Sequence, residues 1–245
     1  MSKPLRVISV LAACALVGGW LWVVYGSGVF AATAVEVTGT DRLTEAQVAS
    51  AAQVPMGTPL ARVDVDAVAA RVGQLSQVAG VTVHRAWPHT VRVEVRERVP
   101  VAAVHRQDRW WLVDRTAVVV ATQPQRPEGL PKLAVDRPEP DDPIARTALA
   151  VIDSLDGSLR DDLVKVSASS PDGVRLRVVV GSDELGERGS AHRKSGGARG
   201  AKFTVVWGNA EHAAKKARVL GALREAKPHA DVYDVSTPGV ATVRK

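Results

Sequence analysis

The residue types that most often carry chemistry are few in this sequence and widely spaced. The six histidines, at positions 84, 89, 105, 192, 212 and 229, form no HExxH motif and no paired spacing typical of a metal site. The only cysteine, Cys14, lies in an uncharged apolar stretch and has no second thiol with which to form a disulfide. No glycine-rich phosphate-binding loop follows an expected strand. We therefore predict that the protein is not an enzyme and takes no cofactor, metal or small-molecule substrate.

Arg85, Glu97 and Arg98 are charged residues expected at strand ends, and such a cluster could be interpreted as an active site. A lone carboxylate without a second acid or a metal has no reaction to perform, however. Carboxylate and guanidinium groups at strand ends commonly fix loop geometry through charge-assisted hydrogen bonds. A structural role for these three side chains is therefore favoured.

The element that would position the rest of the chain is the uncharged run at residues 7–30. Its most apolar part would span about 27 Å as a helix, close to the hydrocarbon thickness of a bilayer. Lys3 and Arg6 precede the run, so the positive-inside rule predicts a cytoplasmic tail at residues 1–6 and an exported remainder. The run is longer than the apolar core of a signal peptide, which favours an uncleaved transmembrane helix over a signal cleaved near residues 32–34.

The exported part carries only a mild positive charge. Removing Lys3 and Arg6 from the 32 basic residues leaves 30 against 26 acidic ones. The predicted topology keeps nucleic acid out of reach, so anionic lipids or wall polymers are the plausible electrostatic neighbours. A solvated surface with no specific partner is favoured over both.

Residues 34–102 show the pattern of a small β-α-α-β-β unit. Thr44 and Gln47 have capping-box spacing, and Asp64 is placed to cap a second helix. Alternating valines predict two half-buried strands, at residues 81–83 and 91–95. An α+β unit of three strands covering two helices follows from this order.

The run RAWPHTVRVEVRERVPVA, at residues 85–102, resembles a POTRA domain, and more narrowly that of the FtsQ/DivIB family of bacterial division proteins. The segments VEVTG and LARVD fit the same family. In that family the POTRA domain is a docking module outside the membrane, so the resemblance implies binding without chemistry. The motif residues that carry the resemblance are Gly39, Asp64, Arg85, Trp87, Pro88, Glu97, Arg98 and Pro100, with Lys216 and Asp234 further along.

Residues 103–245 continue the resemblance, which implies an FtsQ-type β domain. Apolar patterns predict strands at 110–113, 118–120, 163–166, 174–180, 203–207, 230–235 and 239–244, and helices at 144–155 and 209–226. Residues 182–201 are rich in glycine and charge and predict a flexible basic insertion. The predicted fold is therefore α+β, with a transmembrane helix, a POTRA domain and a mixed β-sheet domain with two helices.

The resemblance implies a single-pass type II protein of the bacterial cell membrane, expected at the division septum. It implies a scaffold required for septum formation that recruits FtsB/FtsL-type partners and also FtsW/FtsI-type proteins. In the family a partner adds a strand to the edge formed by the C-terminal strand. That edge is here Gly239, Val240, Ala241, Thr242, Val243 and Arg244.

Three alternatives remain open at this point. The terminal strand can simply be a sheet edge at which the charges of Arg244 and Lys245 discourage pairing with another strand. The chain can be a POTRA-bearing polypeptide transport or assembly factor, which would capture extended peptides whatever their sequence. It can also be a cell-wall hydrolase or a regulator of one, which would release fragments from peptidoglycan.

Overall fold

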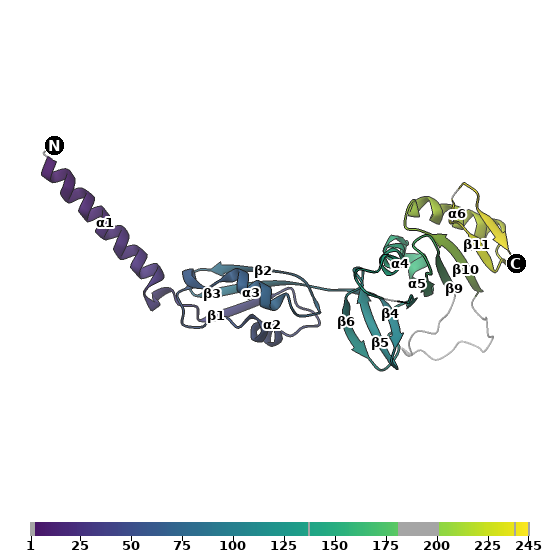
Figure 1. Cartoon of the computed structure of the whole chain (residues 1–245), viewed down its shortest axis with the longest axis horizontal. Helices are drawn as coiled ribbons and strands as arrows, with labels where there is room; N and C mark the ends of the chain where they lie inside the picture. Colours follow the sequence, from purple (N-terminus) through teal and green to yellow (C-terminus); the bar gives the residue numbers. More distant parts are fainter. Residues whose placement is uncertain (1–2, 137, 181–200, 238, 245) are drawn as a thin grey trace, which may run out of the picture. The chain divides into compact units, whose positions relative to one another are not determined.

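The computed structural model describes residues 3–136, 138–180, 201–237 and 239–244, without the side chains of residues 3–7, 9 and 201. The chain divides into two compact units, residues 1–98 and 99–245, which are described separately (Figure 1). The insertion predicted at residues 182–201 lies outside the described residues, apart from its last position.

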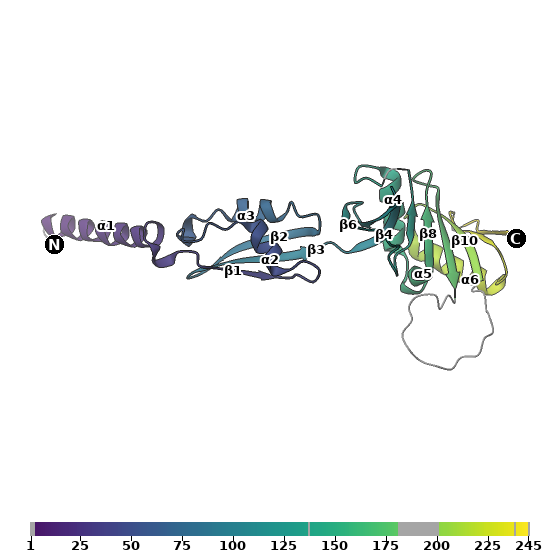
Figure 2. The ribbon, with the colours of Figure 1, turned by 90° about the horizontal axis from the view of Figure 1, so that it is seen from below.

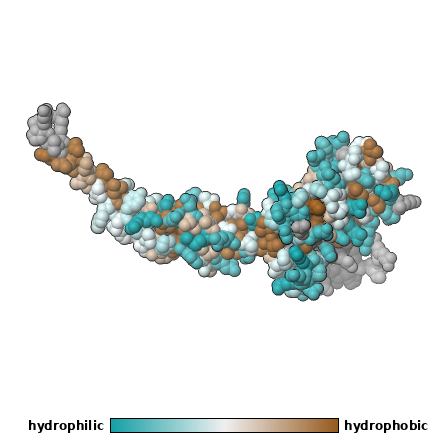
Figure 3. All heavy atoms as spheres, in the orientation of Figure 1, coloured by the Kyte–Doolittle hydropathy of each residue, from teal (hydrophilic) through white to brown (hydrophobic). Residues whose placement is uncertain are grey.

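The first helix, α1 (Lys3–Tyr25), begins before the predicted residue 7 and ends well before residue 30. The Ser27 side chain then caps a short 3-10 helix, η1 (Gly28–Phe30), so the regular helix stops at Tyr25. In the described part of the chain, no helix combines the length and apolar character that crossing a membrane requires. The transmembrane helix predicted over residues 7–30 is therefore not confirmed. Figure 3 shows that α1 nevertheless presents apolar residues at its surface.

The first unit contains a three-stranded sheet in the order β1-β3-β2, with β1 parallel to β3 and β2 antiparallel to it. Its elements after η1 are β1 (Ala34–Thr38), α2 (Glu45–Ala52), η2 (Leu60–Arg62), α3 (Val65–Val72), β2 (Val78–Ala86) and β3 (Thr90–Glu97). Both α-helices cover one face of the sheet (Figure 2). Val48 and Val68 from the helices are fully buried in one core with Val91 and Val93 from β3.

The two helices of this sheet unit begin where capping chemistry predicts. The Thr44 side chain accepts from the Gln47 backbone N–H, and the Gln47 side chain accepts from the Thr44 N–H, which completes a capping box. The Asp64 carboxylate accepts from two backbone N–H groups in the first turn of α3. Local sequence thus determines both starts.

The second unit contains a nine-stranded mixed sheet in the order β12-β11-β10-β9-β8-β7-β4-β5-β6. Its strands are β4 (Pro100–Arg106), β5 (Arg109–Asp114), β6 (Val119–Gln123), β7 (Lys132–Ala134), β8 (Leu163–Ser167), β9 (Val174–Val180), β10 (Ala201–Gly208), β11 (Val232–Asp234) and β12 (Thr242–Arg244). Its helices are α4 (Pro143–Ser154), α5 (Gly157–Asp161) and α6 (Ala213–Ala226). The core joins Leu149 and Ile152 of α4 with Leu176 of β9, Trp207 of β10 and Leu220 of α6.

Several elements differ from the sequence prediction in extent. The α6 helix begins at Ala213 and not at residue 209, because Asn209 folds back to accept from the Glu211 N–H and His212 adopts a left-handed φ of 54°. The short helix α5, capped by Asp156, was not predicted. The terminal strand β12 is also shorter than residues 239–244, and its first described pair is Asp234 with Thr242.

Candidate partner-binding edge

The guanidinium group of Arg85 ties β2 to the segment that precedes α3. Its Nε donates to the Leu60 carbonyl oxygen at 3.1 Å, and its Nη2 donates to the Val63 carbonyl oxygen at 2.7 Å. Leu60 begins η2, and its carbonyl oxygen also accepts from the Val63 N–H, while the Val63 carbonyl follows the end of η2. A planar guanidinium group with several fixed donors suits two neighbouring acceptors. The role of Arg85 is therefore to hold a turn in place.

The carboxylate of Glu97, at the end of β3, closes the turn before α2. It accepts from the backbone N–H groups of Asp41, Arg42 and Leu43 at 2.9–3.2 Å. Partial burial acts to raise the pKa of Glu97, but these N–H groups and the positive charge of Arg42 outweigh it and hold the pKa below its usual value. A carboxylate saturated with donors is a structural anchor and a poor proton acceptor.

Gly39 lies at the same end of the first unit and requires its residue type. Its φ is +81°, and a Cβ atom there would collide with the Val95 carbonyl oxygen. The chain can therefore turn from β1 toward α2 only with glycine at this position.

Arg98 and Pro100 connect the two units along the chain. The Arg98 N–H donates to the Gln77 carbonyl oxygen at 2.7 Å. This bond continues the pairing between β2 and β3 by one residue beyond each strand. Pro100 begins β4 and lies opposite Asp114 in the second sheet. Proline is acceptable there because the first residue of a strand need not donate to the ladder.

Trp87 and Pro88 lie at the opposite end of the first unit from Glu97, in the turn between β2 and β3, and the peptide bond between them is cis. The Trp87 side chain is half exposed, and its ring packs edge-to-face on Phe30 at a centroid distance of 5.5 Å. The sequence motif around Arg85 is thus divided in space between two ends of one unit.

Lys216 is the most deeply buried charged side chain among the described residues of the second unit, with 1% of its surface exposed. Its Nζ donates to the Asn209 backbone carbonyl oxygen at 3.0 Å and to the Asn209 Oδ1 at 3.1 Å. Burial lowers the pKa of Lys216, and the nearby negative charges of Glu211 and Asp172 only partly oppose that shift. Lys216 therefore fixes the turn between β10 and α6.

Asp234 ends β11 and supports the turn that leads to β12. Its carboxylate accepts from the Ser236 N–H at 3.1 Å and from the Ser236 hydroxyl at 2.7 Å. The next N–H, that of Val235, donates to the Val206 carbonyl oxygen of β10 at 2.9 Å. This arrangement fixes the point at which the chain leaves β11.

The strand β12 forms one edge of the nine-stranded sheet. Among the described residues it pairs with β11 alone, and Val243 lies opposite Tyr233. Thr242 and Arg244 are exposed, whereas Val243 packs partly against the core. Gly239, Val240 and Ala241 precede the strand, in a turn where the Val240 N–H donates to the Thr237 carbonyl oxygen. The structure thus places three of the six predicted edge residues in a strand.

The neighbouring strand β11 is held firmly by Tyr233, which the sequence interpretation missed. This side chain is 1% exposed, packs edge-to-face on Phe203 at 5.4 Å, and donates its hydroxyl to the Lys227 carbonyl oxygen at 2.6 Å. Its position in the apolar-Asp-apolar segment around Asp234 was the available signal. A well-anchored β11 gives β12 a fixed template.

A small hollow of about 380 Å³ lies beside this edge. Its lining residues are Ala226, Lys227, Pro228, His229, Ala230 and Val243. The hollow joins the C-terminal end of α6 to the edge strand. Val243 of β12 forms one wall of this hollow.

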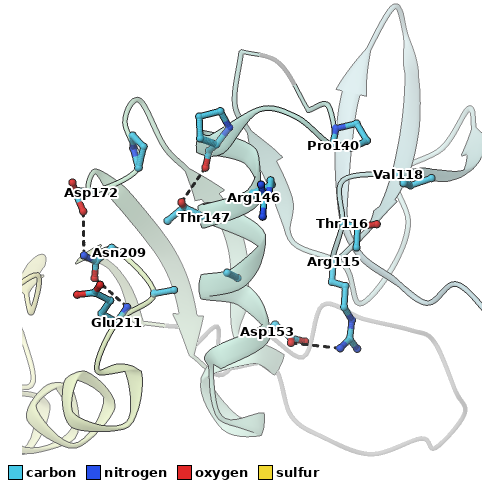
Figure 4. A pocket seen from close by; sticks show the side chains of 14 residues that line it. Arg115, Thr116, Val118, Pro140, Arg146, Thr147, Asp153, Asp172, Asn209 and Glu211 are labelled. Carbon is cyan, nitrogen blue, oxygen red and sulfur yellow. Dashed lines mark hydrogen bonds and ion pairs between the residues drawn. The ribbon is translucent and has the colours of Figure 1, made fainter. Parts of the chain in front are cut away.

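A larger groove of about 870 Å³ runs along α4 (Figure 4). On one side Arg115 points to Asp153 at 3.7 Å, and on the other Asn209 donates to Asp172 at 3.1 Å. These charged groups are satisfied by ion pairing or hydrogen bonding. In the described part of the chain, no three His, Cys, Asp or Glu residues are grouped as metal ligands.

An FtsQ-type POTRA domain matches residues 30–98. The chain is 37% identical over 240 residues to the cell division protein FtsQ of Streptomyces bingchenggensis, covering 94% of this chain and 83% of that protein. It is 36% identical to the cell division protein FtsQ of Streptomyces coelicolor, covering 95% and 85%, and 36% identical to that of Mycobacteroides abscessus, covering 85% and 59%. The chain therefore belongs to the FtsQ family of non-enzymatic cell division proteins.

Proposed function

We propose that this FtsQ homologue is a scaffold that recruits division proteins outside the cell membrane and is required for septum formation. Its docking modules are a POTRA domain at residues 34–102 and a β domain at residues 103–245. The partners are FtsB/FtsL-type proteins and, through the same assembly, FtsW/FtsI-type proteins. All relatives compared above are cell division proteins, which favours a scaffold over a polypeptide transport factor. The non-enzymatic character of the family disfavours a wall hydrolase.

The observation that carries this proposal is the edge position of β12 beside a firmly packed β11. An edge strand presents backbone N–H and C=O groups that a strand from a partner can pair with. The adjacent hollow supplies space for one apolar side chain of that strand. Residues 239–244 are thus proposed to bind an FtsB-type segment that adds a strand to this edge of the sheet.

Proline substitution tests the edge because proline removes a backbone donor and resists pairing. Thr242→Pro, within β12, and Val240→Pro, which removes the N–H that bonds Thr237 in the preceding turn, are compared with Thr242→Val, which changes the side chain but keeps the N–H. Capture of purified FtsB/FtsL-type complex is expected to fall at least tenfold in a proline variant and to be nearly unchanged in Thr242→Val. Binding that survives both prolines, with the second unit folded by circular dichroism, rejects the edge.

We further propose that α1 attaches the chain to the cell membrane as a single-pass type II anchor. The support is the uncharged sequence at residues 7–30 and the exposure of large apolar side chains such as Leu16, Trp20 and Trp22. No described helix meets the length and hydropathy requirements of a bilayer span, so the test of the anchor is a direct measurement of membrane attachment. Full-length protein should float with lipid vesicles and resist alkaline extraction. A chain that stays in the aqueous fraction contradicts the anchor.

The cellular role is tested by depletion of the protein followed by microscopy. A scaffold needed for septation should leave filamentous or branched undivided cells, and a fluorescent fusion should gather at septa. Normal septation after depletion contradicts the proposal.

A further inference from the structure

Three segments meet at one end of the first unit, and one of them is the stretch that directly follows α1. The Ala32 N–H donates to the Thr58 carbonyl oxygen at 2.9 Å, and the Gly57 N–H donates back to the Ala32 carbonyl oxygen at 2.9 Å. The Thr33 N–H donates to the His89 carbonyl oxygen at 2.9 Å. Residues 28–33, 55–59 and 86–90 therefore form one connected surface, here called the proximal tip.

The proximal tip is uncharged, although 24% of the whole chain is charged. None of its sixteen residues is Asp, Glu, Lys or Arg, and its one titratable side chain is His89. The opposite end of the unit differs, because Asp41, Arg42 and Glu97 gather there. The polarity of the unit is thus divided along its strands.

Large apolar side chains project from all three loops of the proximal tip. Val29 is 59% exposed, Met56 is 55% exposed and Trp87 is 50% exposed. Phe30 links two of the loops, because its ring packs edge-to-face on Trp87 at 5.5 Å and is stacked near His89 at 6.5 Å. Leaving three such side chains in water is unfavourable, and a cluster of them marks a surface that something covers.

Continuity with α1 indicates what covers the tip. Tyr25, the last residue of α1, is 51% exposed, and only four positions separate it from Val29. The sequence contains no charged residue between Arg6 and Glu36, so the surface of α1 passes into the tip without an intervening charge. Trp, Tyr and His rings with Met and Val side chains suit the headgroup boundary of a bilayer.

We propose that the proximal tip is a lipid-binding seat that rests in the headgroup region of the membrane into which α1 inserts. This inference rests on the membrane attachment proposed above. Seating Val29, Met56 and Trp87 in the interface removes their apolar surface from water. The seat holds this end of the unit at the bilayer and leaves the charged end, with Glu97, in water.

The lone cysteine makes a direct test available. In full-length Cys14→Ala protein, Val29→Cys or Met56→Cys is labelled with the environment-sensitive fluorophore NBD and reconstituted into vesicles of phosphatidylglycerol and phosphatidylethanolamine. The matched control is Ala46→Cys, an exposed position in α2 at the charged end of the unit. The readouts are quenching by brominated lipid and the rate of NBD reduction by external dithionite, counting only molecules with the label outside.

A seated tip predicts strong quenching by brominated lipid at positions 29 and 56 and none at position 46. It also predicts dithionite reduction several-fold slower at the two tip positions than at Ala46→Cys. Two failures are distinguishable. Protein that does not float with the vesicles overturns both the anchor and the seat. Protein that floats while its tip labels react as fast as the control overturns the seat alone, and leaves the tip to a protein partner.

Discussion

Leu43 and Glu97 are joined by a 2.9 Å hydrogen bond from the Leu43 N–H to Glu97 Oε1, although 54 residues separate them in the chain. The bond brings the end of β3 to the turn between β1 and α2. The same carboxylate binds two further N–H groups of that turn. Within the sequence motif, the Glu97 carboxylate therefore closes the turn before α2, and the Arg98 backbone N–H bonds the residue that precedes β2.

Glu97→Ala should destabilise the first unit. Three backbone N–H groups lose a charged acceptor, and the partial exposure of the site keeps the cost to about 1–3 kcal/mol. Because the chain has two compact units, the measurement is residue-specific hydrogen exchange, and protection of the Leu43 amide should fall first. Glu94→Ala, at an exposed position of the same strand, is the control and should change little. Equal effects from both substitutions would contradict the assigned role.

Acid should remove the contribution of Glu97. Its pKa in the folded chain is below the usual value, so the folded state favours the carboxylate over the protonated form. The stabilisation is present above the unfolded-state pKa, near 4.5, and is lost as pH falls through the lower folded-state pKa. Protection of the Leu43 amide should therefore decline below about pH 4.5, and Glu97→Gln should flatten that decline. An unchanged acid profile in Glu97→Gln would count against the pKa shift.

Gly39→Ala should cost more stability than Gly57→Ala. Both glycines have a positive φ, +81° and +80°, so both substitutions carry about 1 kcal/mol of backbone strain. Only at Gly39 does the new Cβ meet backbone, the Val95 carbonyl oxygen, while at Gly57 the space is open. The free energy of unfolding of the first unit, measured by denaturant titration, should separate the two variants. Similar values would show that the turn relaxes around the added methyl group.

Arg85→Lys should destabilise the first unit although the charge is kept. A single ammonium group cannot reach the Leu60 and Val63 carbonyl oxygens with the geometry of a guanidinium group. The expected loss is about 1–2 kcal/mol. The control is Arg92→Lys, whose exposed ion pair with Glu36 contributes little. Thermal unfolding followed by far-ultraviolet circular dichroism measures both, and equal midpoints would refute the role given to Arg85.

Alkaline pH should stabilise the second unit through Lys216. Burial lowers the pKa of Lys216 in the folded chain, so the charged ammonium group is less favourable in the folded state than in the unfolded state. Below the folded-state pKa, where both states are charged, this difference reduces the free energy of unfolding. Stability should rise as pH increases from the folded-state pKa toward the unfolded-state value of 10.5. Lys216→Met, with a similar apolar stem but no charge, should lack this rise. The difference in unfolding free energy between the two proteins, taken at several pH values, isolates the effect, and parallel pH profiles would contradict it.

Local sequence predicted the elements whose causes are local. The capping box at Thr44 and Gln47, the Asp64 cap and the alternating valines of β3 depend on neighbours within a few residues, and each was found where the pattern placed it. The short strand β7 and helix α5 carry too few residues for periodicity to show. The length of α1 was also misjudged, because hydropathy alone does not reveal that Ser27 starts a new turn.

By itself the sequence determined the family, the β-α-α-β-β order and the residue types at each motif position, since these depend on composition and spacing along the chain. Only the tertiary structure decided where those residues act. It separated Trp87 from Glu97 at two ends of one unit, used Lys216 to hold a buried turn, and placed β12 at a sheet edge beside Tyr233. These outcomes come from contacts between residues far apart in the chain, whose partners are set by packing and strand register, and no local pattern encodes them.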